Sequence, residues 1–270
     1  MASGLAAIAD PDTSCAAIAA GTPKPISALG WARASLRIAA LAALLLICIP
    51  VYYLFRLLAV QNPWPRIFLG GVAMIAGVRI KPRGQRPAGP VFLIANHVSW
   101  IDIPALSWVT GTAFVGHDGL AAMPLLKTLC EMNDTVFIAR HDRSSIAQQV
   151  EAVRTAMAET HALTIFLEGT TSDGTGLLPF KSSLLSAFEP LPSGIAVQPV
   201  LLDYGDEAAD IAWVGEEHGL DNFLRILARA RPIALTVIFL PPLSGPQLEN
   251  RKTIAGAARE GLLSELTSRG

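Results

Sequence analysis

One histidine and one carboxylate lie five positions apart in the stretch VFLIANHVSWIDI, residues 91–103. His97 is suited to proton transfer because the ordinary pKa of imidazole is near neutral. A carboxylate on its second ring nitrogen, here from Asp102, would fix the tautomer and stabilise the imidazolium. The pair predicts a general base that activates a hydroxyl group for attack on a carbonyl carbon, without a nucleophile from the protein. The alternative is a helix-capping Asp102 beside a half-buried histidine.

A short strand and a turn are needed to bring this pair together. The five apolar residues Val91 to Ala95 follow a Pro- and Gly-rich segment, which predicts a buried strand. Five positions on a regular helix would place two side chains on poorly matched faces. We therefore expect a turn between His97 and Asp102, with Ser99 or Asp102 near the start of the next helix. Strand exits of this kind carry the active sites of many α/β folds.

Two more stretches place polar side chains at predicted strand ends. The stretch TIFLEGTTSDG, residues 164–174, reaches Glu168 and continues with hydroxyl and carboxylate side chains that could receive an anionic or polyol group. The stretch VFIAR ends in Arg140, a bidentate donor for phosphate or carboxylate. The alternatives are a solvated loop for the first stretch and a surface salt bridge from Arg140 to Asp142 for the second.

Composition favours one catalytic domain that associates with a membrane. A chain of 270 residues can bury a full core, and its 51% hydrophobic content and mean hydropathy of +0.44 exceed those of ordinary soluble enzymes. The three cysteines have neither metal-ligand spacing nor an even count, so we expect a reducing compartment and no metal site. Motifs for a nucleophile elbow, a phosphate-binding loop or a dinucleotide are absent from the sequence.

Charge is distributed unevenly along the chain, although the formal net charge is only −1. Between Thr13 and Ile101 there is no acidic residue and there are nine Lys and Arg residues, whereas the remainder is acidic. A basic, apolar segment without interleaved aromatic residues favours an anionic membrane surface over a nucleic acid.

The N-terminal region predicts a tail followed by two apolar helices. Residues 1–30 have the composition of a disordered tail. Residues 38–55 are 18 uncharged residues, the lower limit for a membrane-spanning helix, and Pro50 would kink it. Residues 67–78 are too few to cross. We expect a membrane-docking helix pair within residues 31–80 that dips into the membrane and returns, with a single span as the alternative.

Beyond a basic linker at residues 81–90, short apolar runs alternate with helical stretches as far as the C-terminus. This alternation predicts an α/β fold with a mostly parallel sheet flanked by helices, over residues 91–270. The expected strands are residues 91–95, 113–116, 135–139, 163–167, 195–202 and 233–240. The expected helices are residues 104–109, 124–132, 144–160, 182–188, 221–230 and 247–268.

Four stretches in order resemble the sequence blocks of the glycerolipid acyltransferases of the 1-acyl-sn-glycerol-3-phosphate (lysophosphatidate) type. NHVSWID resembles the H-x-x-x-x-D signature, VFIAR the second block, FLEGTTSDG the third and VQPV, residues 197–200, the fourth. The resemblance spans roughly residues 91–242. It implies the glycerolipid acyltransferase fold, and the basic apolar segment ahead of it is similar to the membrane-docking helices of that family.

The resemblance also implies a mechanism. His97 would be the general base that deprotonates the acceptor hydroxyl, and Asp102 would orient it. The activated oxygen would attack the thioester of acyl-CoA or acyl carrier protein, without a covalent enzyme intermediate, a cofactor or a metal. Arg140 would bind the anionic head of the acceptor. The residues expected to shape the acceptor site are Glu168, Gly169, Thr170 and Thr171.

Two departures from the family pattern concern the acceptor. Thr171 stands where the third block usually has arginine, and Ala139 replaces the acid that commonly precedes the arginine of the second block. Because a hydroxyl does not replace a bidentate charged contact, phosphate recognition would be weakened or moved to Arg140, Arg143 or Lys181. The default acceptor is 1-acylglycerol-3-phosphate, which would yield phosphatidate in phospholipid biosynthesis. The alternative is lyso-ornithine lipid, because the Thr-Ser-Asp-Gly continuation is similar to bacterial members acting on it.

Two more remote functions stay open at this point. A membrane-anchored esterase or thioesterase could use the same pair to activate water, and a lipid-binding protein could retain a decayed site. Since both acyl donors are cytoplasmic, we expect the catalytic domain on the cytoplasmic face of the bacterial inner membrane, anchored by residues 36–80. Its expected partners are membrane lipids, a lysolipid acceptor and the acyl donor, and not a nucleic acid.

Overall fold

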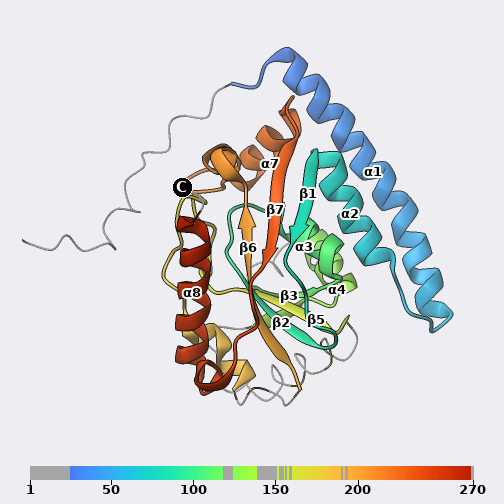
Figure 1. The fold of residues 1–270 in the computed structure, drawn as a ribbon. Coiled ribbons are helices and arrows are strands. Elements are labelled where there is room, and N and C mark those ends of the chain that lie inside the picture. The colour runs from blue at the N-terminus through green and yellow to red at the C-terminus, as the bar shows by residue number, and fades with distance from the viewer. Residues whose placement is uncertain are drawn as a thin grey trace, which may run out of the picture.

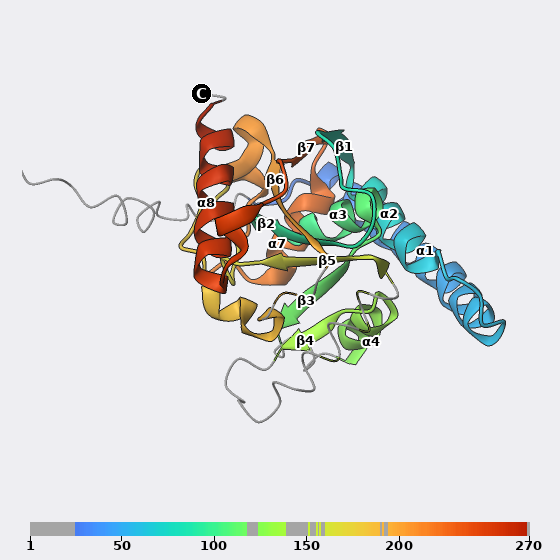
Figure 2. The ribbon, with the colours of Figure 1, turned by 60° about the horizontal axis from the view of Figure 1, so that its bottom comes forward.

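The computed structural model describes residues 25–117, 124–138, 160–189 and 194–268, together with residues 151, 155, 157 and 191. They form a seven-stranded sheet in the order β1-β7-β6-β2-β5-β3-β4, with helices on both faces (Figures 1 and 2). All neighbouring strands are parallel except β6 and β7. The α/β fold with a mostly parallel sheet is therefore confirmed.

The elements follow the expected order from residue 91 onward. The strands are β1 (Val78–Arg83), β2 (Val91–Ala95), β3 (Ala113–His117), β4 (Val136–Ile138), β5 (Ala162–Phe166), β6 (Ala196–Asp203) and β7 (Ile233–Phe239). The α-helices are α1 (Ala28–Leu57), α2 (Trp64–Ala76), α3 (Asp102–Thr110), α4 (Pro124–Met132), α6 (Ala208–Ile211), α7 (Gly219–Ala228) and α8 (Arg251–Thr267). In the part of the chain that the structure describes, the 3₁₀ helices are η4 (Ser182–Phe188), η5 (Gly205–Glu207) and η6 (Gly245–Leu248). Most of the expected helix at residues 144–160 lies outside the described residues.

The central strand β2 explains why its sequence is apolar without interruption. Leu93 and Ala95 face a core that is covered by α1, α2, α3 and α7, whereas Phe92 and Ile94 face a second core on the α8 side. All five β2 residues are buried, because the strand has helices on both of its faces.

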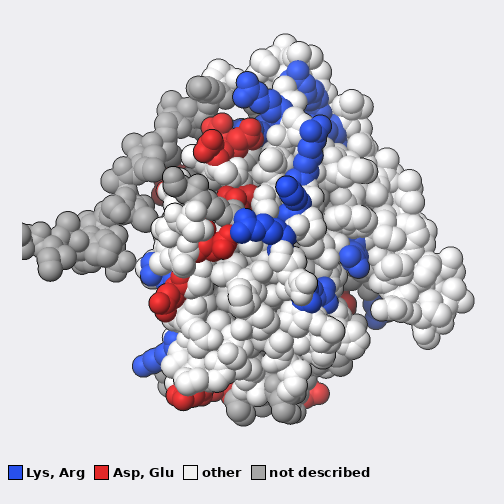
Figure 3. All heavy atoms as spheres, in the orientation of Figure 1, with Lys and Arg blue, Asp and Glu red and all other residues white. Residues whose placement is uncertain are grey.

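The expected linker at residues 81–90 is wrong in its first part. Residues 78–83 form β1, which pairs in parallel with β7 at the edge of the sheet. Arg79, Lys81 and Arg83 alternate along the exposed side of this strand, and Pro82 is tolerated because an edge strand has only one partner. Figure 3 shows a band of Lys and Arg that runs from the start of α1 over β1 and β7, between the largely uncharged far part of α1 and α2 and acidic groups nearer α8. The sheet therefore begins at Val78 rather than at residue 91.

The helices α1 and α2 form an antiparallel hairpin (Figure 1). The first half of α1 packs against the catalytic domain. Ala34 is fully buried in the core, and a Cβ atom at Gly30 would lie 3.4 Å from that of Ala228 at the end of α7. The far half of α1 instead exposes large apolar side chains, including Leu54 and Leu57. Within the described residues, α1 is the one helix that is long and apolar enough to cross a membrane, with a mean hydropathy of 2.5. Residues 28–30, expected in the tail, are helical.

Three arginines of the basic N-terminal third serve the fold itself. Arg37 donates to the carbonyl oxygens of Leu227 at 2.9 Å and Arg229 at 3.1 Å, at the C-terminal end of α7. Arg66 donates to Trp108 O at 2.9 Å, and Arg86 donates to Thr110 O, both at the end of α3. A cation at a helix C-terminus satisfies unpaired carbonyl groups and favours the helix dipole. The guanidinium groups of these three arginines therefore bind backbone carbonyl groups of the protein rather than a membrane.

Candidate active site

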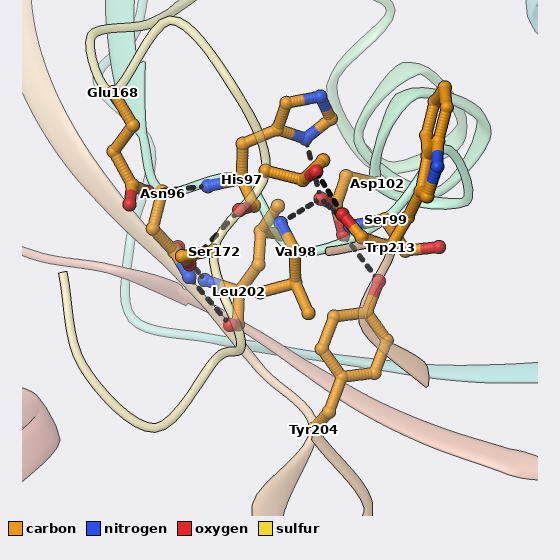
Figure 4. Close-up of polar contacts among 11 residues, drawn as sticks. Asn96, His97, Val98, Ser99, Asp102, Glu168, Ser172, Leu202, Tyr204 and Trp213 are labelled. Carbon is orange, nitrogen blue, oxygen red and sulfur yellow. Dashed lines mark hydrogen bonds and ion pairs between the residues drawn. The ribbon is translucent and has the colours of Figure 1, made fainter. Parts of the chain in front are cut away.

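His97 and Asp102 meet across the turn between β2 and α3, as the expected turn requires. His97 Nδ1 lies 2.8 Å from Asp102 Oδ2 (Figure 4). The same oxygen accepts the backbone N–H groups of Val98 at 2.7 Å and Ser99 at 2.9 Å. The Asp102 side chain is fully buried in the first turn of α3, where the helix dipole favours a negative charge.

This geometry leaves one imidazole nitrogen available for chemistry. Because Nδ1 donates to the carboxylate, Nε2 keeps its lone pair, and it points away from Asp102 (Figure 4). The Phe166 ring stacks on the imidazole with centroids 4.1 Å apart and an interplanar angle of 17°. The His97 side chain is 18% exposed, so the imidazole can be reached from the solvent side. A group placed this way can accept a proton and hold the resulting charge.

The third sequence block fixes the backbone of His97. Glu168 Oε1 accepts the N–H of His97 at 2.8 Å, and Oε2 accepts the N–H of Leu178 at 2.8 Å. On the opposite side, Ser172 donates to the carbonyl oxygen of His97 through its N–H at 2.7 Å and its hydroxyl at 3.1 Å. Both backbone groups of the histidine are therefore held by one loop.

Glu168 is a buried positioning residue, with only 1% of its surface exposed. Burial raises its pKa to about 7, although the two backbone N–H donors and His97 act in the opposite direction. Both carboxylate oxygens already have partners inside the protein. A contact between Glu168 and the acceptor stays a prediction.

The residues that follow Glu168 lie at the rim of the site. Gly169 adopts a positive φ of 71°, which glycine allows where the chain leaves β5, and Thr170 is exposed. The Thr171 hydroxyl donates to the carbonyl oxygen of Trp213, whose own N–H donates to Val98 O at 3.0 Å. Thr171 therefore joins the third block to the segment after α6, and that segment is bonded to the catalytic turn.

Sequence reasoning missed two polar residues beneath the pair. Asn96, 2% exposed, links the ends of β2 and β6 by donating to Leu202 O at 3.1 Å and accepting Leu202 N–H at 2.7 Å. Tyr204 donates its hydroxyl to Asp102 Oδ1. Burial, followed by the charge of Asp102, raises the pKa of Tyr204 well above its ordinary value, so the phenol stays protonated. The signal that could have found both residues is a polar group directly after each of two neighbouring parallel strands.

The remaining candidates are placed only in part. Arg140 and Arg143 lie outside the described residues. Lys181 is exposed at the start of η4, and its N–H donates to Leu167 O at 2.8 Å. Among the described residues no three His, Cys, Asp or Glu side chains gather as metal ligands would.

Comparisons with known proteins agree with this site. The family model described as Acyltransferase matches residues 77–203, which contain all four blocks. A lyso-ornithine lipid O-acyltransferase of Rhodobacter capsulatus is 30% identical over 91% of this chain and 94% of its own length. A 1-acyl-sn-glycerol-3-phosphate acyltransferase of Neisseria gonorrhoeae is 36% identical over 47% of this chain and 49% of its own length.

The fold has a counterpart among solved structures. The crystal structure of the 1-acyl-sn-glycerophosphate acyltransferase PlsC from Thermotoga maritima superposes with a TM-score of 0.62, over 89% of this chain and 97% of that chain, at 18% identity. The fold is therefore shared well beyond the level of recognisable sequence identity. Together with the four blocks and the full-length relative, these matches establish that the chain belongs to the acyltransferase family and is an acyltransferase of lysolipids.

Proposed function

We propose that this enzyme transfers a fatty acyl chain from acyl-CoA or acyl carrier protein to the hydroxyl group of a lyso-ornithine lipid. The observation that carries the proposal is the similarity to the Rhodobacter capsulatus lyso-ornithine lipid O-acyltransferase, which extends over nearly the whole of both chains. A Brucella abortus enzyme of the same name is 36% identical over 65% of this chain and 69% of its own length. This order reverses the one expected from the sequence, where 1-acylglycerol-3-phosphate came first.

The position of Thr171 supports an acceptor without phosphate. The glycerolipid acyltransferase pattern has arginine here, a residue that binds phosphate through two parallel hydrogen bonds. In this protein the Thr171 hydroxyl hydrogen is used by the carbonyl oxygen of Trp213. Ornithine carries no phosphate, so the phosphate contact of that arginine has no counterpart in this acceptor.

The catalytic pair suits the chemistry of an O-acylation. Nε2 of His97 would take the proton of the acceptor hydroxyl as its oxygen attacks the thioester carbonyl carbon. The buried carboxylate of Asp102 would balance the imidazolium charge. As the new ester C–O bond forms and the C–S bond breaks, the imidazolium would return the proton to the departing thiolate. No protein nucleophile is needed.

The α1 and α2 hairpin is proposed as the membrane anchor. Its far end exposes Leu54, Leu57, Leu58 and Val60, and large apolar side chains exposed together in this way are typical of a surface that enters lipid. The basic band over β1 and β7 lies beside the largely uncharged far part of the hairpin (Figure 3), where anionic head groups would attract it. Because acyl-CoA and acyl carrier protein are cytoplasmic, the bound face would be the cytoplasmic one.

A lysolipid panel tests the proposal. Purified full-length protein in detergent is supplied with acyl-CoA or acyl carrier protein as donor and with lyso-ornithine lipid, 1-acylglycerol-3-phosphate or no acceptor. We expect O-acylation of lyso-ornithine lipid with a higher kcat/KM than that for 1-acylglycerol-3-phosphate. Turnover of 1-acylglycerol-3-phosphate alone would overturn the proposed acceptor, and release of free fatty acid at the same rate without any lysolipid would favour a thioesterase.

A substitution at position 171 tests whether this residue selects the head group of the acceptor. Thr171→Arg should raise kcat/KM for the phosphate-bearing acceptor relative to lyso-ornithine lipid, since it restores the residue usual in the third block. Ser183→Arg, which adds the same charge on the exposed surface of η4, is the control. An equal effect of both substitutions would show that net charge, and not position 171, reads the head group.

A further inference from the structure

The fourth sequence block has no role in the chemistry described so far. It lies within β6, which pairs with β2 in the sheet and ends at Asp203. The next residue is Tyr204, which is 4% exposed and packs in the same core as Val98 and Ala208. Figure 4 shows its hydroxyl directed at the carboxylate of Asp102 from the side opposite to His97. The strand that contains the block therefore delivers a buried hydroxyl to the catalytic pair.

The hydrogen bonds of Asp102 are divided unequally between its two oxygens. Oδ2 accepts three donors, from His97, Val98 and Ser99. Within the described residues, Oδ1 accepts one, the hydroxyl of Tyr204. A fully buried carboxylate oxygen that loses its donor is costly, because water cannot replace it. Tyr204 is thus the group that satisfies the second oxygen.

We infer that Tyr204 is a positioning residue of the acyltransferase reaction, which acts on His97 through Asp102. It has two effects on the pair. The hydroxyl holds the plane of the carboxylate, so that Oδ2 stays aimed at Nδ1 of the imidazole. It also draws negative charge toward Oδ1, which moderates how strongly the carboxylate stabilises the imidazolium.

The charged and titratable groups around the pair come from two elements. In the described part of the chain, Glu168 faces His97 from the loop after β5, and Tyr204 faces Asp102 from the end of β6. Tyr204→Phe keeps the buried ring and removes only the hydroxyl. With Val98 and Ser99 still holding Oδ2, the carboxylate then concentrates more charge on the side of His97. The imidazolium then becomes more stable relative to the neutral ring.

The test is the pH profile of the purified full-length enzyme with whichever lysolipid the wild type turns over. Tyr204→Phe should lower kcat about ten-fold, as expected for one lost hydrogen bond to a charged group, with little change in KM. The acid limb of kcat/KM should move up by roughly half to one pH unit. Because the acceptor is chosen by turnover, a wrong proposal for lyso-ornithine lipid would not affect this result.

A double-mutant cycle separates positioning from packing. In an Asp102→Asn background, Tyr204→Phe should cost less than about two-fold, since its route to His97 has already been removed. An equal loss in both backgrounds, or an acid limb that stays in place or moves down, would overturn the inference.

A second measurement avoids any loss of folding by the phenylalanine variant. Replacing the tyrosines with 3-fluorotyrosine makes the phenol a stronger donor and should move the acid limb to lower pH, opposite to Tyr204→Phe. The chain has three tyrosines, and the other two lie on α1. An unmoved limb in the fluorinated protein would contradict the role of Tyr204.

Discussion

Replacing Glu168 with glutamine should flatten the pH dependence of folding stability. Burial raises the pKa of Glu168 from 4.5 to about 7, so between these values the folded protein binds a proton that the unfolded chain has released. Its contribution to stability is fully present below pH 4.5 and is lost as the pH rises through 7. One pKa unit corresponds to about 1.4 kcal/mol, so the total change is about 3 kcal/mol, and roughly 2.5 kcal/mol of it falls between pH 5 and 8.

The assay is urea unfolding in detergent micelles, monitored by tryptophan fluorescence. It is carried out for the wild type and for Glu168→Gln from pH 5 to 8. Glu168→Gln keeps the shape of the side chain and cannot titrate, and its lost N–H acceptor adds an offset that does not depend on pH. The free energy of unfolding of the wild type should fall relative to the variant by about 2 to 3 kcal/mol across this range. Glu216→Gln, at an exposed position, is the control. Parallel curves for the wild type and Glu168→Gln would refute the reasoning.

Three further predictions address the pair, the fold and the anchor. Asp102→Asn should lower kcat by about 10² to 10⁴ with the fold intact, and activity within three-fold of wild type would contradict a role for the carboxylate. Arg37→Ala should lower the free energy of unfolding by about 2 kcal/mol, because the end of α7 loses its donor, whereas Arg56→Ala, an exposed position, should not. The double substitution Leu57→Glu and Leu58→Glu should reduce sedimentation with anionic vesicles at least ten-fold while leaving turnover of lysolipid in detergent unchanged; unaltered sedimentation would argue against the hairpin as anchor.

Much of the fold could be predicted because the strands are short, apolar and separated by helical stretches. The run from Val91 to Ala95 could be recognised as a buried strand, and the turn that joins His97 to Asp102 followed from their spacing. The expected helix at residues 124–132 matches α4 at both ends. These features depend on local patterns, which a sequence displays directly.

What could not be predicted depends on contacts between distant segments. β1 looks like a linker because Arg79, Lys81 and Pro82 are unusual in a strand, and only its place at the sheet edge makes them acceptable. Glu168 and Tyr204 reach the catalytic pair through strand neighbours that are not adjacent in sequence. A buried tyrosine after a strand also resembles ordinary core, so its hydroxyl gives no signal until its partner is known.

The reversal between β6 and β7 decides which end of β1 lies beside the central strand. Ala95 at the end of β2 pairs with Val200, which pairs with Phe239, so the end of β2 is level with the end of β1. Val78, at the start of β1, lies beyond the end of β2, on the side of the sheet where the chain turns toward His97. The hairpin ends at Ala76 and therefore joins the domain on that side. Had β7 and β1 run parallel with β6, the proposed membrane anchor and the base would lie on opposite sides of the sheet.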